Sequence, residues 1–169
     1  AETLREMKAA GCLQIEYGFE SGSDAMLRAL GKNTTTEMNL RAARLTHEAG
    51  LRIYANIMVG LPGETEDDLR ATLRFVRKTR PEILSFARLY PLPGTDIYNA
   101  LSDSDRAKLP WAACTYLEDA DFPVNITAIP TERFARLYRE IDKYWLNPTL
   151  TWQLYRDTPR GDPRRRELR

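Results

Sequence analysis

The stretch LRIYANIMVGLPGETEDDL, residues 51–69, decides how the chain folds. Its first nine residues are mostly apolar and include β-branched side chains, which is typical of a strand covered on both faces; Asn56 is a polar exception. In the turn GLPG, glycine permits unusual dihedral angles and proline stiffens the backbone. Thr65 and Asp68 then have the spacing of a helix capping box, with Asp in place of the usual Glu. The stretch predicts a strand, a tight turn and a helix.

The same unit extends in both directions along the chain. Residues 13–20 alternate between apolar and polar side chains, which is the period of a strand, and residues 83–90 predict a third strand. Capping residues, helical spacing and terminating Gly or Pro predict helices over 1–11, 24–30, 34–50, 65–81, 96–109 and 131–145, with a further turn over 150–155. This alternation of strands and helices predicts an α/β fold with a parallel sheet and helices outside it.

Length and composition are those of an ordinary globular domain. The chain has 169 residues, enough for one domain with a core, and its net charge of +1 gives no overall field that would attract nucleic acid or a membrane. No apolar run is as long as a membrane span. The two cysteines, Cys12 and Cys114, are far apart and predict reduced thiols and a cytoplasmic location. The chain lacks a starting Met, so we expect it to be part of a longer protein.

A polar residue lies near the carboxyl end of each predicted strand: Glu20, Asn56 and Arg88. Ligands in parallel α/β folds bind at this end of the sheet. In the first strand, Gln14 and Glu16 share a face with Glu20, which indicates a barrel open enough to hold a ligand. Any one of these residues could be a solvated strand end, but three at equivalent positions favour a site. The GLPG turn itself matches neither a Walker loop nor a dinucleotide fingerprint, and a plain strand-to-helix turn also explains it.

Three motifs in order make the pattern specific: GFESGSD at 18–24 with LRALGK at 27–32, NIMVGLPGETED at 56–67, and YPLPGTDIY at 90–98. Together they resemble the C-terminal half of a radical S-adenosylmethionine (SAM) enzyme over roughly residues 5–100. The resemblance implies a partial TIM-like (β/α)6 barrel in which residues 1–109 supply strands four to six. An irregular connection over 110–130, a helical extension over 131–155 and an Arg-rich tail over 156–169, expected to be disordered, would follow.

The resemblance also implies a chemistry for the complete protein. In that family a Cys-x-x-x-Cys-x-x-Cys loop after the first strand holds a [4Fe–4S] cluster, which cleaves SAM to a 5′-deoxyadenosyl radical that abstracts hydrogen from a small-molecule substrate. That loop is absent from this chain, so we expect neither catalytic nor metal-binding residues here and no activity of the chain alone. A reductant protein is the implied partner. The most similar subgroup contains methyltransferases and anaerobic magnesium-porphyrin ester cyclases, often with an upstream cobalamin-binding domain.

The matching positions imply roles for individual residues. Glu20 would contact the SAM ribose or nearby polar groups, Lys32 the methionine carboxylate, and Asn56 a ribose hydroxyl. The family's Gly-x-Ile-x-Gly-x-x-Glu pattern departs here in residue and spacing, which leaves Glu64 without an assigned role. Residues 58–60 would lie along the adenine and the 92–95 loop would close over it. With the strand-end argument added, the other expected cofactor-binding residues are Ser21, Met58, Val59, Gly60, Arg88 and Pro93.

Three other hypotheses remain open from the sequence. The chain could belong to a barrel enzyme without a cluster, or it could be a helical interaction module with helix–turn units repeating near 34 residues. The tail over 156–169 holds six Arg against three acids, so RNA is a minor option as a partner. Half a barrel also exposes strand edges, which predicts that the chain dimerises through them.

Overall fold

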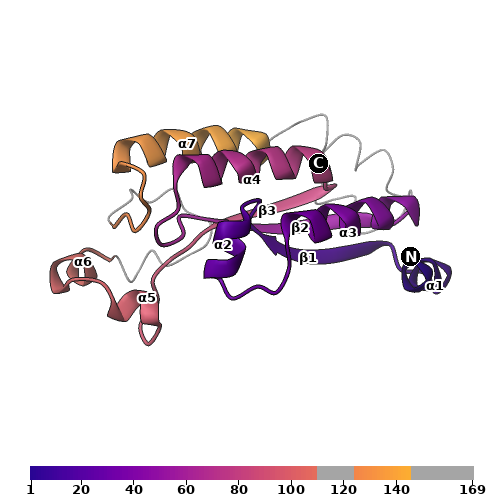
Figure 1. The fold of residues 1–169 in the computed structure, drawn as a ribbon, viewed down its shortest axis with the longest axis horizontal. Helices are drawn as coiled ribbons and strands as arrows, with labels where there is room; N and C mark the ends of the chain where they lie inside the picture. Colours follow the sequence, from indigo (N-terminus) through magenta and orange to yellow (C-terminus); the bar gives the residue numbers. More distant parts are fainter. Residues whose placement is uncertain (110–123, 146–169) are drawn as a thin grey trace, which may run out of the picture.

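The computed structural model describes residues 1–109 and 124–145, and its centre is a parallel sheet (Figure 1). Strands β1 (Gln14–Glu20), β2 (Arg52–Val59) and β3 (Ile83–Arg88) lie in the order β1-β2-β3. The helices are α1 (Glu2–Ala9), α2 (Asp24–Ala29), α3 (Thr36–Glu48), α4 (Glu66–Thr79), α5 (Asp96–Asn99), α6 (Asp103–Lys108) and α7 (Thr131–Trp145). The predicted α/β alternation and the parallel sheet are confirmed.

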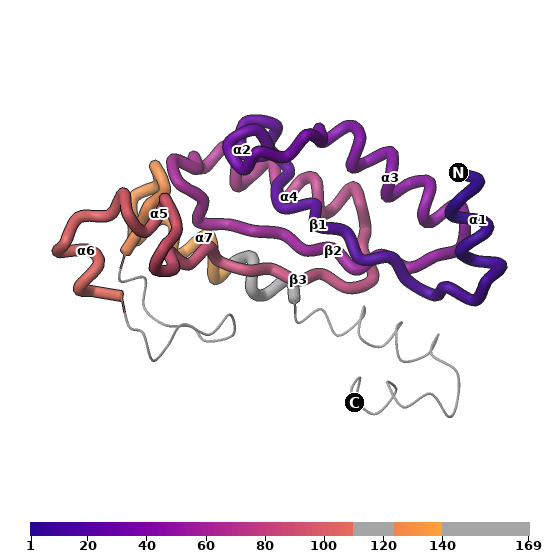
Figure 2. The backbone as a smooth tube through the Cα atoms, turned by 90° about the horizontal axis from the view of Figure 1, so that it is seen from below, coloured from indigo at the N-terminus to yellow at the C-terminus, as the bar shows by residue number. Residues whose placement is uncertain are grey.

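Helices α3, α4 and α7 cover one face of the sheet. Alternate residues of β2 form the core on this face and are at most 1% exposed: Ile53, Ala55, Ile57 and Val59. The intervening residues point to the other face and are partly exposed: Arg52, Tyr54, Asn56 and Met58. Figure 2 shows β1, β2 and β3 running side by side in this order. Among the described residues, β2 is therefore covered on one face rather than on the expected two, as in a barrel segment whose inner face is open.

Helix α7 belongs to the same core as the strands. Phe134 and Leu137, each 2% exposed, pack into the cluster that contains Val59 and Phe86. At the amino end of α7, Arg133 is paired with Glu66 in the first turn of α4. The helix expected over 131–145 is present, and it covers the sheet beside α4 (Figure 1).

Local capping interactions explain where several helices begin. The capping box of Thr65 and Asp68 is present as expected. Helix α3 is capped by Thr35 rather than Thr34, whose hydroxyl would have been the expected cap. The single helix expected over 96–109 is wrong: the structure has α5 and α6 instead, because Ser102 caps a second helix after a break at 100–102.

The loop after β1 docks tightly on α4. Ser21 Oγ lies 3.1 Å from Thr72 Oγ1, and the Gly22 amide donates to the same Thr72 oxygen at 3.0 Å. A methyl group added at Gly22 would lie 2.4 Å from Phe75 Cβ and 2.6 Å from Thr72 Cα. Only glycine at position 22 allows the loop to lie this close to α4. This contact fixes the position of α2 and of the residues after it.

Some of the expectations cannot be compared with the structure. The irregular connection lies mostly, and the turn at 150–155 and the Arg-rich tail lie entirely, outside the described residues. Within the described ranges, none of the helices combines the length and the apolar character needed to cross a bilayer.

Candidate functional site

The candidate site lies on the open face of the sheet, at the carboxyl ends of β1 and β2. Gly18 is in register with Asn56 on the neighbouring strand, so both residues look toward the same side. Asn56 Nδ2 donates to Glu16 Oε1 at 2.7 Å, which holds the amide across the two strands. The polar face predicted from the alternation in β1 is therefore formed by residues of two strands.

A backbone irregularity turns Glu20 over this face. The register shifts between Gly18 and Glu20, and Glu20 has a left-handed φ of 63°, which is uncommon for a residue with a side chain. Its carboxylate lies so close to Gly18 that an added methyl group there would be 2.7 Å from Glu20 Oε1. Strained backbone of this kind is concentrated at functional sites, where the surrounding structure holds it in place.

Lys32 reaches the same point from the loop after α2. Its Nζ donates to Glu20 Oε1 at 3.1 Å, and the two side chains are 40% and 17% exposed. The same missing methyl group at Gly18 would lie 3.6 Å from Lys32 Nζ. The Glu20 carboxylate and the Lys32 ammonium group thus lie directly over Gly18, and Asn56 is beside it on the next strand.

Arg88 is not brought together with these residues. It is in register with Val59, whose side chain is fully buried on the helix-covered face, so Arg88 points to that face as well. A methyl group added at Gly60 would lie 3.2 Å from Arg88 Cγ and 3.3 Å from Phe134 Cζ, under α7. Val59 and Arg88 therefore lie on the side of the sheet opposite Asn56, and only their backbone could contact a ligand on the open face.

The remaining expected residues have mixed placements. Met58 is on the open face with Asn56, next along β2, and is partly exposed. Ser21 is fully buried and its hydroxyl is engaged by Thr72 and by the Ser23 amide. Pro93 is exposed in the loop before α5, at the same end of the sheet. Met58 is placed to contact a ligand, whereas the position of Ser21 is that of a structural residue.

The burial of the Glu64 side chain could not be predicted from the sequence. Its side chain is fully buried and folds back on the GLPG turn, where Oε2 accepts the Gly60 amide at 2.7 Å and the Leu61 amide at 3.4 Å. Burial raises the pKa of this carboxyl to about 7, against the opposing effect of the two amides. Oε1 has no hydrogen-bond partner among the described residues. The carboxyl thus holds the turn at the end of β2 in shape.

The turn is also tied to the segment before α7. The Gly63 amide donates to the Ile126 carbonyl at 3.0 Å, and the Ala128 amide donates to the Glu64 carbonyl at 2.9 Å. Asn125 organises this segment by donating to the Ile129 carbonyl at 2.6 Å. Sequence spacing gives no sign of these contacts, because they join residues about 60 positions apart.

The described residues offer no place for a metal ion. Among residues 1–109 and 124–145, no three His, Cys, Asp or Glu side chains gather as a ligand set. The thiol of Cys12 points to the Gln14 carbonyl at 3.4 Å, far along β1 from Glu20. The site can therefore bind through hydrogen bonds and charge, but it has no described ligands for iron or another metal.

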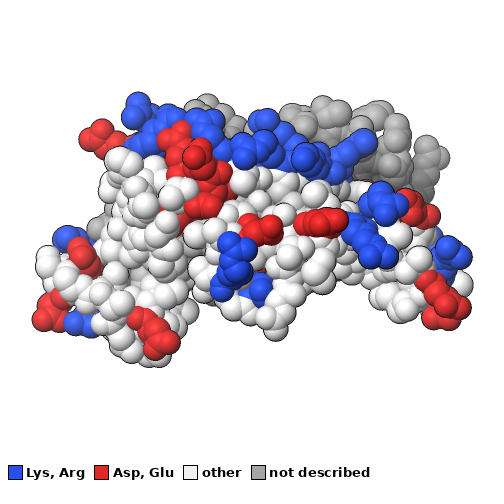
Figure 3. Space-filling model, viewed as in Figure 1, with Lys and Arg blue, Asp and Glu red and all other residues white. Residues whose placement is uncertain are grey.

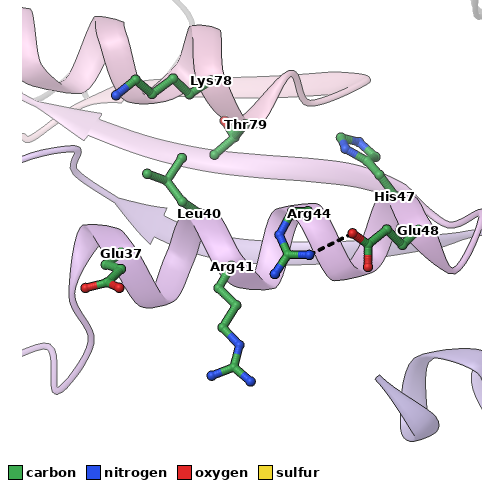
Figure 4. Close-up of a pocket in the computed structure, with 8 residues that line it drawn as sticks. All are labelled: Glu37, Leu40, Arg41, Arg44, His47, Glu48, Lys78 and Thr79. Atoms are coloured by element: carbon green, nitrogen blue, oxygen red, sulfur yellow. Dashed lines mark hydrogen bonds and ion pairs between the residues drawn. The ribbon is translucent and has the colours of Figure 1, made fainter.

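A separate cavity of about 520 Å³ lies between α3 and α4 (Figure 4). Its charged groups have both signs, since Glu37 and Glu48 line it together with Arg41, Arg44 and Lys78, and Arg44 is already paired with Glu48 at 2.8 Å. Arg41 points away from α4, so the cations do not converge on one point (Figure 4). The charged side chains of this cavity therefore do not form a binding site comparable to Glu20 and Lys32 beside Gly18.

Comparison with known proteins finds one family match and several relatives. The family model of the Radical SAM superfamily matches residues 1–76. An uncharacterized methyltransferase of Pyrococcus horikoshii is 25% identical over 140 residues, which are 82% of this chain and 30% of the relative. An anaerobic magnesium-protoporphyrin IX monomethyl ester cyclase of Rubrivivax gelatinosus is 31% identical over 96 residues, which are 57% of this chain and 17% of the relative. The chain thus spans less than a third of these relatives.

A solved structure supports the same fold. The Elp3 protein of the archaeon Methanocaldococcus infernus, in a form lacking residues 1–46, superposes with a TM-score of 0.52 at 16% identity. The match covers 86% of this chain and 39% of that chain. At this level of identity the likeness concerns the fold, and it agrees with an open segment of a larger barrel.

Proposed function

Because residues 1–76 place this chain in the radical SAM superfamily, we propose that it forms the SAM-binding C-terminal part of a radical SAM barrel. The observation that carries the proposal is the group on the open face: Glu20 paired with Lys32 beside the side-chain-free Gly18, with Asn56 on the next strand. Membership of the superfamily supports an enzyme function for the complete protein. Binding of SAM at this group is the finer proposal.

The side chains of Lys32, Glu20 and Asn56 fit two polar parts of SAM, its methionine carboxylate and its ribose hydroxyls. An ammonium group suits the methionine carboxylate, and Lys32 is 40% exposed, so it can exchange Glu20 for a ligand carboxylate. Ribose hydroxyls can donate hydrogen bonds to the Glu20 carboxylate, and the Asn56 amide can both donate to them and accept from them. Met58 adds an apolar contact for the adenine. The glycine at position 18 allows the Glu20 carboxylate to lie close over the strand, since an added methyl group would be 2.7 Å from Glu20 Oε1.

The cluster has no fitting residues in this chain. Among the described residues no three His, Cys, Asp or Glu side chains gather as a ligand set, and the sequence has only Cys12 and Cys114, not the three closely spaced cysteines of the family's cluster loop. We therefore assign the cluster to a part of the complete protein outside this chain, and we expect the chain alone to be inactive. Next to a reduced cluster, bound SAM supplies a 5′-deoxyadenosyl radical; this chain's share is to bind and orient the SAM.

The reaction of the complete protein is proposed only as a class. The relatives named above include a methyltransferase and an ester cyclase, so we propose hydrogen abstraction from a small-molecule substrate, followed by methylation or oxidative ring formation. A reductant protein and an upstream cobalamin-binding domain are part of this proposal, whose support is the likeness to these relatives. The cytoplasmic location and dimerisation through strand edges remain predictions.

Cleavage of SAM by the complete protein tests the enzyme class. The protein would be reconstituted anaerobically with iron and sulfide, reduced, and assayed for 5′-deoxyadenosine. We expect production by the wild type and a loss of at least about tenfold in Asn56→Ala, because one hydrogen bond to a ribose is removed and Glu16 is left without its partner. A protein that binds no cluster and releases no 5′-deoxyadenosine would contradict the proposal.

A further inference from the structure

The outer surfaces of α4 and α7 carry two parallel rows of cations. On α4 these are Arg70, Arg74, Arg77 and Lys78, and on α7 they are Arg133, Arg136 and Arg139; together they are called the cationic ridge. Each row has helical spacing, so its members follow one side of the helix at about one per turn. Figure 3 shows Lys and Arg side chains gathered along the upper side of the molecule, over α4 and its surroundings.

The net positive charge of the ridge comes mainly from α4, because the sequence of α7 also contains Glu132, Glu140 and Asp142 beside its cations. From Leu69 to Thr79, α4 contains no acidic residue. Glu66 at the beginning of α4 accepts both Arg70 and Arg133, each at 2.6 Å, and thereby fixes the near end of both rows. Of the other cations of the ridge, Arg74, Lys78 and Arg136 are exposed and make no ion pair with another described residue. Their charge is available to a partner.

The composition of the ridge distinguishes between kinds of partner. Protein interfaces are built around buried apolar and aromatic side chains, and membrane-binding helices insert an apolar face. Among the described residues the exposed large apolar side chains are Met7, Leu13, Met38 and Leu92, and none of them lies on α4 or α7. Six of the seven cations of the ridge are Arg, whose planar group suits phosphate oxygens. The surface therefore fits phosphates in a row and offers little to an apolar partner.

We propose that the cationic ridge binds the phosphate backbone of a double-stranded nucleic acid without reading its sequence. Salt bridges to phosphates position a protein on nucleic acid and carry no sequence information. The ridge lies on the outer side of the helix layer, whereas Glu20 and Asn56 lie on the other side of the sheet. The inference is thus independent of SAM binding, and it is also separate from the Arg-rich tail.

The test is a titration of fluorescein-labelled duplexes of about 20 base pairs, or two helical turns, with the complete protein. One duplex is RNA and the other is DNA of the same sequence, and anisotropy is recorded at several salt concentrations. The ridge variant is Arg74→Glu, Lys78→Glu and Arg136→Glu together. Its matched control is Arg5→Glu, Lys8→Glu and Arg28→Glu, which changes the charge equally on exposed residues of α1 and α2.

We expect both duplexes to bind the wild type and the control variant, with an affinity that falls as salt rises. The ridge variant should bind at least about tenfold more weakly, and the slope of log K against log salt should decrease by about 2 to 3, because three phosphate contacts are lost. An unchanged melting temperature would show that the variant is folded. Equal affinity of the ridge and control variants, binding of only one duplex, or no binding by the wild type would overturn the proposal.

Discussion

Replacing Gly22 with alanine is expected to destabilise the protein by about 3 kcal/mol, the upper part of the range for overpacked sites. The new methyl group would lie 2.4 Å from Phe75 Cβ, 2.6 Å from Thr72 Cα and 2.8 Å from the Ala71 carbonyl oxygen. These atoms belong to the α4 backbone or are attached directly to it, so no flexible side chain can move aside. The loop after β1 would separate from α4, and melting of the complete protein measured by calorimetry should show this.

Gly63→Ala is the matched control for this substitution. Gly63 has a positive φ of 71° but has nothing within 4 Å of an added methyl group. Its substitution should therefore cost only the backbone strain, about 1 kcal/mol. If the two variants melt at the same temperature, the close approach of Gly22 to α4 does not contribute to stability as described.

Glu64 gives a pH dependence with a definite sign. Burial raises the pKa of its carboxyl from 4.5 to about 7 in the folded protein, so the folded state holds the proton more tightly than the unfolded state does. The contribution of this group to stability is therefore present below about pH 4.5 and is lost as the pH rises to about 7, by roughly 3 kcal/mol in total. Above about pH 8, where the folded protein is also ionised at this group, it should not change further.

Glu64→Gln isolates this effect, because the amide oxygen can still accept the Gly60 and Leu61 amides but the side chain cannot ionise. We expect the melting temperature of the wild type, relative to this variant, to fall between pH 5 and pH 8. Glu64→Ala leaves both amides without an acceptor and, relative to Glu64→Gln, should cost about 2 to 3 kcal/mol at any pH in this range. A difference between wild type and Glu64→Gln that is constant with pH would show that the carboxyl is not the titrating group.

The element pattern could be predicted from the sequence because local chemistry determines it. The alternation at 13–20, the apolar run before Val59 and the Thr65 cap each correspond to an observed element. The break before α6 was missed because Ser102, a good helix cap, lies within a stretch whose spacing also fits one continuous helix. The resemblance to the radical SAM family agrees with the family model that matches residues 1–76, and the expected partial barrel agrees with the fold of the solved structure.

The placement of the candidate side chains could be predicted only in part, since side-chain direction depends on the register between strands. Asn56 faces the open side as expected, but the pairing of Arg88 with Val59 places Arg88 on the helix side. Glu20 meets Lys32 only because of a register shift and a left-handed φ, which leave no mark in the sequence. The cationic ridge has a sequence signal, the spacing of Arg on α4 and α7, but the overall charge of +1 conceals it.

Equilibrium binding of SAM to the complete, unreduced protein shows whether Lys32 and Glu20 form part of a SAM site. Lys32→Ala is compared with the wild type and with Lys8→Ala, which removes an exposed cation of α1. The account predicts that Lys32→Ala binds SAM about tenfold more weakly, the effect of one partly exposed charge-assisted bond, while Lys8→Ala binds as the wild type does. Equal affinities in all three proteins would contradict the account.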